Sequence, residues 1–220
     1  MLNNNEKSKF IDDIMLSSFE ADSISFKCNG CGDCCKHRGD IFLSPPDVYY
    51  ICRYLKISVD TFMDTYATRN GIELCIKDKG DTERTCAFYG TQIGCLIHPI
   101  KPKTCYMYPF IEFDPQKYRV QKTRCVSDSE LTSVQAKKIG TIIANNSCRY
   151  EPEKEILARY FKLFDDFENK IHKKGIDIED AENFFLNMFI FNINLKMDES
   201  NFFYWFEKQI IIVEDALVML

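Results

Sequence analysis

The sequence lacks the short motifs that identify common nucleotide-binding and hydrolytic folds. Its nine glycines never form G-x-G-x-x-G, and G-x-x-x-x-G-K-[ST] does not occur. H-E-x-x-H and G-x-S-x-G are absent as well. A separate Rossmann-type domain that binds a nucleotide or S-adenosylmethionine is therefore unsupported.

The sequence also lacks a long hydrophobic run, and we expect no secretory leader. Its longest apolar stretch, residues 184–191 (FFLNMFIF), is interrupted by Asn187, whereas a helix that crosses a bilayer needs about 20 apolar residues. The first ten residues contain no apolar segment and no small-residue cleavage site. The net charge of -5 argues against a surface that coats nucleic acid. We therefore expect a cytoplasmic protein that binds neither nucleic acid nor membranes.

Cysteine is the residue type that the sequence has in excess. Ten of the 11 cysteines lie between Cys28 and Cys125, and none follows Cys148. Because the number is odd, disulfides within the chain cannot pair all of them. Thiols in the cytoplasm stay mostly reduced, so this density indicates metal binding rather than disulfides.

The composition divides the chain into two parts. The last 70 residues, from Glu151, contain ten of the 18 Phe and the only Trp, whereas Gly, Pro and Cys concentrate before them. We predict an α+β protein, in which a small cysteine-rich metal-binding domain with short helices and hairpins spans residues 20–127. An all-helical extension then spans residues 128–220. Its aromatic helices either bury a core or cover one face of the cysteine-rich part, so that the two parts form one unit.

Local patterns predict individual elements. Ser44-Pro45-Pro46-Asp47 is a good helix start with Ser44 as the N-cap, and it begins a helix that continues over residues 48–55. Lys173-Lys174-Gly175 ends a long helix whose apolar residues recur at helical spacings from Ile156. The patterns further predict helices over 10–19 and 58–66, a strand over 72–76, hairpins from 85–88 with 94–97 and from 111–113 with 118–121, and helices that begin near 178 and 198.

The strongest signal is the C-x2-C-x2-C-C run in residues 26–35 (FKCNGCGDCC). A C-x2-C turn brings two thiolates to one side of a tight loop, where Gly30 and Gly32 permit positive φ. Bound metal would keep the thiolates charged and would cross-link a loop that has little core of its own. We expect the side chains of the adjacent Cys34 and Cys35 to diverge, which favours two sites, or one cluster and a separate thiol.

A second, widely spaced set of cysteines follows the first. Gly and Pro residues give it turn-like surroundings, and the two sets together supply eight thiols, which is enough for two four-cysteine sites. The candidate metal ligands are Cys28, Cys31, Cys34, Cys35, Cys86, Cys95, Cys105 and Cys125.

Taken in order, these stretches resemble the YkgJ-type cysteine-cluster family, which has a CxxCxxCC signature and is described as zinc- or iron-chelating. The resemblance covers about residues 24–127 and leaves the C-terminal helices unexplained. His98 stands where the family usually has Tyr, Tyr106 where it has Arg, and Ser127 where it often has Gly. The matching stretches are residues 26–35, 41–58 (IFLSPPDVYYICRYLKIS), 86–110 (CAFYGTQIGCLIHPIKPKTCYMYPF) and Cys125.

Two kinds of cofactor suit these residues. Soft thiolates bind both zinc and iron, and C-x2-C-x2-C also resembles the first three ligands of a bacterial ferredoxin loop. We place an iron–sulfur cluster (4Fe–4S) first and zinc second. The thiolates would hold two metal centres, or one cluster and one structural ion.

Three functions remain open, and the sequence leaves undecided whether the protein is an enzyme. The first is a metal-binding protein of the YkgJ type that transfers electrons or handles metal. The second is an S-adenosylmethionine-dependent methylase of protein lysine side chains. It rests on the family resemblance, since some members are named flagellin lysine N-methylases. The third is a module with structural metal whose aromatic C-terminal helices bind a protein substrate or partner.

The remaining cysteines and histidines have simpler interpretations. Cys52 lies on an apolar helical face and is expected to pack in the core, and Cys75 and Cys148 are expected to be structural. His37 is expected to be a solvated loop residue. His98 stays an open candidate for a functional role.

Overall fold

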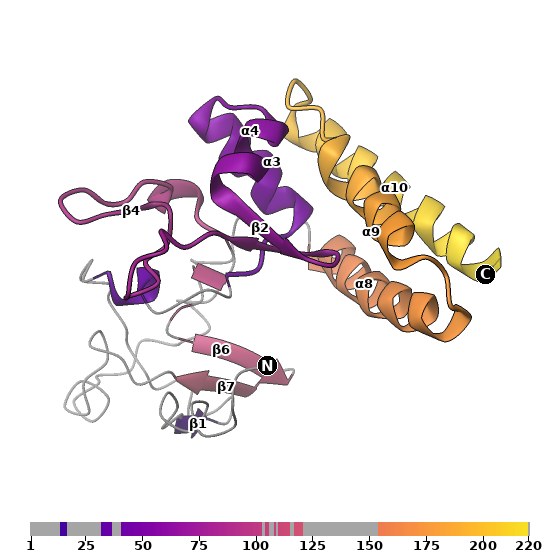
Figure 1. Cartoon of the computed structure of the whole chain (residues 1–220), viewed down its shortest axis with the longest axis horizontal. Coiled ribbons are helices and arrows are strands. Elements are labelled where there is room, and N and C mark those ends of the chain that lie inside the picture. The colour runs from indigo at the N-terminus through magenta and orange to yellow at the C-terminus, as the bar shows by residue number, and fades with distance from the viewer. Residues whose placement is uncertain are drawn as a thin grey trace. The chain divides into compact units, whose positions relative to one another are not determined.

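The computed structural model (Figure 1) describes residues 14–16, 32–36, 41–102, 104–105, 108, 110–114, 117–120 and 154–219. Helices, small antiparallel hairpins and a C-terminal helical region confirm the predicted α+β class. The predicted domain boundary after residue 127 lies outside the described residues and stays a prediction. The chain divides into two compact units: unit 1 is Met1–Arg38, Lys79–Leu96 and Lys103–Arg149, and unit 2 is Gly39–Asp78, Ile97–Pro102 and Tyr150–Leu220.

Two short helices, α3 (Pro45–Leu55) and α4 (Val59–Tyr66), lie in the first segment of unit 2. The carboxylate of Asp47 accepts hydrogen bonds from the backbone N–H and the hydroxyl of Ser44, at 2.9 and 2.7 Å. This contact fixes the chain where α3 begins, because it satisfies donors that precede the first helical turn. The predicted helix start is thus confirmed.

A small hairpin follows α4 in unit 2. Strands β2 (Ala67–Asn70) and β3 (Glu73–Ile76) pair in antiparallel register, so the strand predicted over 72–76 is confirmed. Gly71 adopts a φ of +65° in the turn between them, a conformation that favours glycine. Cys75 also forms a β-bridge with Phe42.

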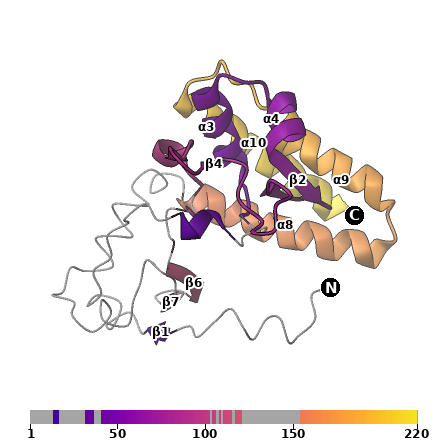
Figure 2. The ribbon, with the colours of Figure 1, turned by 60° about the vertical axis from the view of Figure 1, so that its left-hand side comes forward.

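Three long helical segments complete unit 2. They are α8 (Lys154–Lys174), α9 (Ile178–Leu186), which continues as the π-helical segment η4 (Asn187–Phe191), and α10 (Glu199–Met219). Gly175 ends α8 with a φ of +63°, as the sequence predicts. Figures 1 and 2 show that α8 and α9 are joined by a short turn and lie side by side.

An aromatic cluster forms the core of unit 2. The ring centroid of Tyr160 on α8 lies 5.1 Å from that of Phe189 and 5.4 Å from that of Phe206. Tyr49 of α3 stacks on Phe202 of α10, with 4.0 Å between the centroids and 10° between the ring planes. Most aromatic residues of the C-terminal helices are therefore core residues, and these helices share their core with α3.

The buried hydroxyl of Tyr160 leads to a prediction about stability. Burial raises the pKa of Tyr160, and among the described residues nothing accepts a hydrogen bond from its hydroxyl. Tyr160→Phe should therefore keep or raise the free energy of unfolding, by up to about 1 kcal/mol. Above pH ~10 the tyrosine ionises in the unfolded chain but stays neutral in the folded one, which favours the unfolded state. The free energy of unfolding should therefore fall more for the wild type than for Tyr160→Phe above that pH. Urea titrations at pH 8 and pH 10.5 measure both effects; equal losses for the two proteins at pH 10.5 would contradict the prediction.

Unit 1 contains short elements. They are the 3-10 turn η1 (Asp33–Cys35), the hairpin of β4 (Tyr89–Gly90) and β5 (Gly94–Cys95), and the hairpin of β6 (Phe110–Asp114) and β7 (Lys117–Val120). The second hairpin confirms the sequence prediction. The first is shorter than predicted, because only two residue pairs, Tyr89 with Cys95 and Gly90 with Gly94, are in register.

The prediction of a helix over residues 10–19 is wrong where the structure describes that segment. Ile14–Leu16 forms strand β1, which pairs antiparallel with β7 in a three-stranded sheet of order β1-β7-β6. A short apolar run cannot be assigned to helix or strand by periodicity alone, and here pairing with a distant strand decides. The other residues of 10–19 lie outside the described part.

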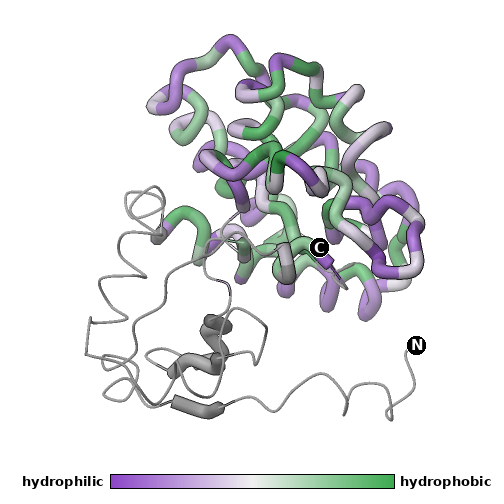
Figure 3. Tube along the Cα trace, turned by 90° about the vertical axis from the view of Figure 1, so that its left-hand side faces the viewer, coloured by the Kyte–Doolittle hydropathy of each residue, from purple (hydrophilic) through white to green (hydrophobic). Residues whose placement is uncertain are grey.

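Hydrophobic and hydrophilic residues interleave along the helices of unit 2, as Figure 3 shows. This is the pattern of helices that bury one face and expose the other. None of the helices in the described ranges combines the length with the apolar composition that crossing a bilayer requires.

Candidate metal centre

The structure describes five of the eight predicted ligands: Cys34, Cys35, Cys86, Cys95 and Cys105, all in segments of unit 1. The sulfurs of these five are thiols rather than members of disulfides. The other three predicted ligands, Cys28, Cys31 and Cys125, lie outside the described residues.

The turn η1 brings two of these thiols together. The backbone N–H of Cys35 donates to the carbonyl of Gly32 at 2.9 Å, which closes the turn. The Sγ atoms of Cys34 and Cys35 lie 3.8 Å apart. The expectation that these adjacent side chains diverge is therefore wrong, because their torsions let both sulfurs turn to the same side of the tight turn.

The two sets of cysteines meet at Cys35. Its carbonyl accepts a hydrogen bond from the backbone N–H of Cys86 at 2.7 Å, which ties the first motif to the start of the second. Its thiol interacts with the thiols of Cys34 and Cys95, and these hydrogen bonds, followed by burial, raise its pKa. One cysteine of the first set is thus linked through its backbone and its sulfur to two cysteines of the second set.

The hairpin β4–β5 holds Cys95 next to Cys86. The N–H of Tyr89 donates to the carbonyl of Cys86 at 2.9 Å, and the N–H of Leu96 donates to the carbonyl of Phe88 at 2.9 Å. Phe88 is fully buried and anchors this hairpin in unit 1. Burial raises the pKa of the Cys86 thiol to about 11, and the neighbouring Cys95 and Cys34 add to this effect. These pKa shifts describe thiols without metal, whose protons a bound ion displaces.

Tyr89 packs over the glycine of the first motif. Gly32 is buried with a φ of +80°, and a Cβ built on it would lie 2.6 Å from the Cζ of Tyr89 and closer still to the hydroxyl oxygen. The sequence indicates Gly32 only as a residue that permits positive φ, and it does not predict that Tyr89 packs over this glycine. A glycine inside a ligand loop can also mark the close approach of another group, but the sequence alone does not identify that group.

Further polar contacts tie down the loop that precedes Cys86. Lys79 and Thr85 close it by a backbone hydrogen bond of 2.8 Å, and the carboxylate of Asp81 accepts the N–H of Thr85 at 2.8 Å. That hydrogen bond lowers the pKa of Asp81. Lys36, directly after the first motif, forms an ion pair of 2.7 Å with Glu83 of this loop. The loop and the end of the first motif are thereby fastened to each other.

The donor chemistry fits a soft metal ion, but the described ligands do not form a complete shell. Two thiolates that share one tetrahedral ion, each at ~2.3 Å, lie about 3.8 Å apart, which is the distance between the sulfurs of Cys34 and Cys35. Within the described ranges, however, no three Cys, His, Asp or Glu side chains stand in a geometry that could hold a metal.

The other candidate residues lie in unit 2. Cys52 is fully buried in α3, which confirms the expected core position, and burial raises the pKa of its thiol to about 12. Cys75 lies half-buried in β3, as expected for a structural residue. His98 begins the short 3-10 helix η2 (His98–Ile100), and partial burial and the nearby Lys101 lower its pKa. No described contact gives His98 a functional role.

Comparison with known proteins identifies the cysteine-rich region. No solved structure matches the chain. A family model described as "CxxCxxCC: Putative zinc- or iron-chelating domain" matches residues 27–126. The match includes both cysteine sets and ends before the helices α8–α10. The resemblance inferred from the sequence is thereby confirmed: residues 27–126 of this chain match the model of the CxxCxxCC cysteine-cluster domains.

Proposed function

We propose that unit 1 binds a zinc or iron ion through thiolates drawn from both cysteine sets, with Cys34, Cys35, Cys86 and Cys95 as the described members of the centre. The observation that carries the proposal is the position of Cys35, whose thiol interacts with those of Cys34 and Cys95. Thiolates are the ligands that zinc and iron–sulfur centres prefer. The family description, zinc or iron chelation, supports the same chemistry.

The sulfur spacing bears on the type of centre. In a four-iron cluster each cysteine binds its own iron, whereas a single ion or a two-iron cluster places two thiolates on one metal. The 3.8 Å between the Cys34 and Cys35 sulfurs matches the second arrangement. We therefore favour a single ion or a two-iron cluster over the four-iron cluster that the first motif suggests.

Metal bound at this place would cross-link the turn η1 to the hairpin β4–β5. Zinc supplies only this cross-link, whereas iron adds one-electron redox chemistry. The protein's own contribution is the arrangement of donors: the η1 turn aligns Cys34 with Cys35, and the β4–β5 pairing sets Cys95 beside Cys86. The alternative methylase activity rests on the family resemblance alone and stays a prediction.

Cys35→Ser is expected to lose most of the bound metal, because this residue joins the two sets. Protein purified without oxygen is analysed for zinc, iron and acid-labile sulfide and by its visible spectrum. Cys75→Ser is the matched control, since it removes a half-buried thiol from a strand of unit 2 and should keep the metal. A Cys35→Ser protein with the full metal content of the wild type would refute the proposal. A colourless wild type that contains only zinc would eliminate iron.

The number of centres can be measured in the same way. If one centre is shared between the sets, Cys31→Ser and Cys95→Ser should each remove the same equivalents of metal. If each substitution removes a different fraction and the double variant removes the sum, the two sets hold separate ions.

A further inference from the structure

An open groove lies in unit 2 between α8 and the last turns of α10. Its volume is about 770 Å³, and it follows α8 from Arg159 to Lys174. The 16 residues from Arg159 to Lys174 extend about 22 Å along the helix axis. Leu163 and Leu217, which are 3% and 8% exposed, form its apolar floor.

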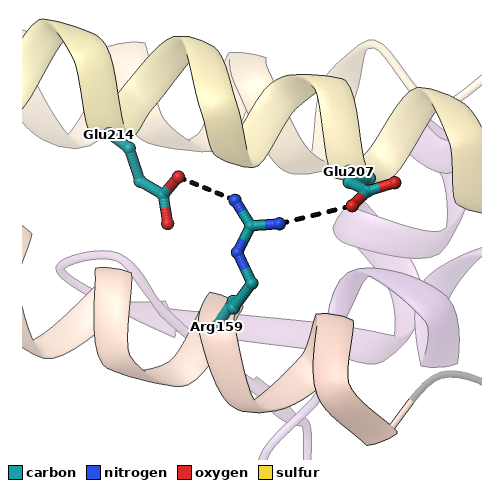
Figure 4. Close-up of polar contacts among 3 residues, drawn as sticks. All are labelled: Arg159, Glu207 and Glu214. Atoms are coloured by element: carbon teal, nitrogen blue, oxygen red, sulfur yellow. Dashed lines mark hydrogen bonds and ion pairs between the residues drawn. The ribbon is translucent and has the colours of Figure 1, made fainter.

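Two of the basic side chains along the groove have structural roles. The guanidinium of Arg159 bridges α8 to α10 through Glu207 at 3.3 Å and Glu214 at 2.8 Å, as Figure 4 shows. The ammonium of Lys170 donates to the backbone carbonyl of Leu217 in the last turn of α10. These contacts hold the two helices at the spacing that leaves the groove open.

Three further lysines line the groove without such a role. Lys162, Lys173 and Lys174 are exposed, and none of them forms an ion pair with a described residue. Since 11 residues are about three helical turns, Lys162 and Lys173 lie on the same face of α8. Asp166 and Glu214 also line the groove. Glu214 is paired with Arg159, so Asp166 is the lining carboxylate left to face three ammonium groups, which it cannot balance.

The helix dipole explains only part of this charge. Basic residues near the C-terminus of a helix are stabilising, which accounts for Lys173 and Lys174. It does not account for Lys162, which lies about three turns before the end of α8. The groove is also positive in a chain whose net charge is -5, so it differs from the average surface of the molecule.

From this combination we propose that the groove binds an acidic amphipathic helix of a partner protein. The apolar floor would receive one hydrophobic face, and the lysines would contact carboxylates on both sides of it. The length of the groove suits a helix of about four turns. This interaction surface is distinct from the aromatic residues of the same helices, most of which are in the core.

The test uses the full-length protein and a fluorescein-labelled, 16-residue model peptide with leucines on one helical face and glutamates beside them. Fluorescence anisotropy should detect binding that weakens as salt rises. Lys162→Glu with Lys173→Glu should weaken binding about tenfold or more, because two attractive contacts become repulsive. Lys196→Glu with Lys208→Glu is the control, since it changes the same charge at exposed positions outside the groove.

Three outcomes would overturn the proposal. The first is that a matched peptide with lysines in place of the glutamates binds equally well. The second is that both double variants weaken binding to the same extent. The third is that vesicles of anionic lipid, rather than the peptide, bind the protein through Lys162 and Lys173. Metal content is measured in every variant and should not change, so failure here is distinct from failure of the metal-binding proposal.

Discussion

Gly32→Ala is expected to remove most of the metal from the centre. The new methyl group would overlap the ring of Tyr89, and the φ of +80° at this position is unfavourable for alanine. The backbone of Tyr89 is held by the N–H contact with Cys86 and by the contact of its carbonyl with Lys79, so the overlap must be relieved by rotating the ring or by shifting the turn. A shift of the turn would displace Cys34 and Cys35, and with the strain of alanine at this φ the cost is about 2–4 kcal/mol. Metal affinity should fall by about two orders of magnitude.

A matched control separates the overlap from the backbone strain. Gly80 lies in the same unit with a φ of +70°, but a Cβ built there would meet no atom within 4 Å. Gly80→Ala should therefore cost only about 1 kcal/mol and keep the metal. Competition with a chromophoric chelator measures the affinity of each variant. Equal affinities for the Gly32 and Gly80 variants would show that the Tyr89 contact has no role.

The double variant Gly32→Ala with Tyr89→Ala tests the same contact from the other side. Removing the ring should restore part of the affinity that Gly32→Ala loses, because the overlap disappears while the strain at residue 32 remains. Tyr89→Ala alone should be milder than Gly32→Ala. If the affinity loss of the double variant, relative to the wild type, equals the sum of the two single losses, the two residues act independently.

The sequence predicts best what is decided within a few residues. The start of α3 depends on the contact between Ser44 and Asp47, and the end of α8 depends on Gly175; both signals lie at the helix ends that they fix. The same holds for the hairpin β6–β7, in which Asp114 at the end of one strand pairs with Lys117 at the start of the next. Local chemistry carries enough free energy in these cases to decide the structure.

What the sequence could not predict depends on distant segments. Strand β1 exists because β7 offers it an edge, and the sulfurs of Cys34 and Cys35 converge in a turn that is tied to Cys86, 51 residues further along the chain. The aromatic stacking of Tyr49 on Phe202 likewise joins residues from opposite halves of the sequence. Spacing shows which thiols are available to a metal, but it cannot show which of them meet.

Phe206→Ala is expected to destabilise unit 2 by about 3–5 kcal/mol. Phe206 is fully buried in α10, and its ring lies 5.4 Å from that of Tyr160, 6.0 Å from that of Phe189 and 6.1 Å from that of Phe202. Truncation would leave a cavity among three aromatic rings that cannot close around it without losing their own contacts. A domain of this size is stable by only about 5–15 kcal/mol, so the loss should be evident in urea unfolding followed by circular dichroism.

Tyr204 provides the matched control on the same helix, two residues away. Its side chain is 64% exposed and contacts the ammonium of Lys208, so Tyr204→Ala should change the free energy of unfolding by about 0.5 kcal/mol or less. A difference of several kcal/mol between the two variants would mean that one face of α10 packs into the aromatic core while the other stays in solvent. Equal losses would mean that α10 does not pack through Phe206. The same core joins α10 to α3, and α3 lies between the two cysteine sets, within the residues that match the family model. The C-terminal helices therefore stabilise part of that matched region.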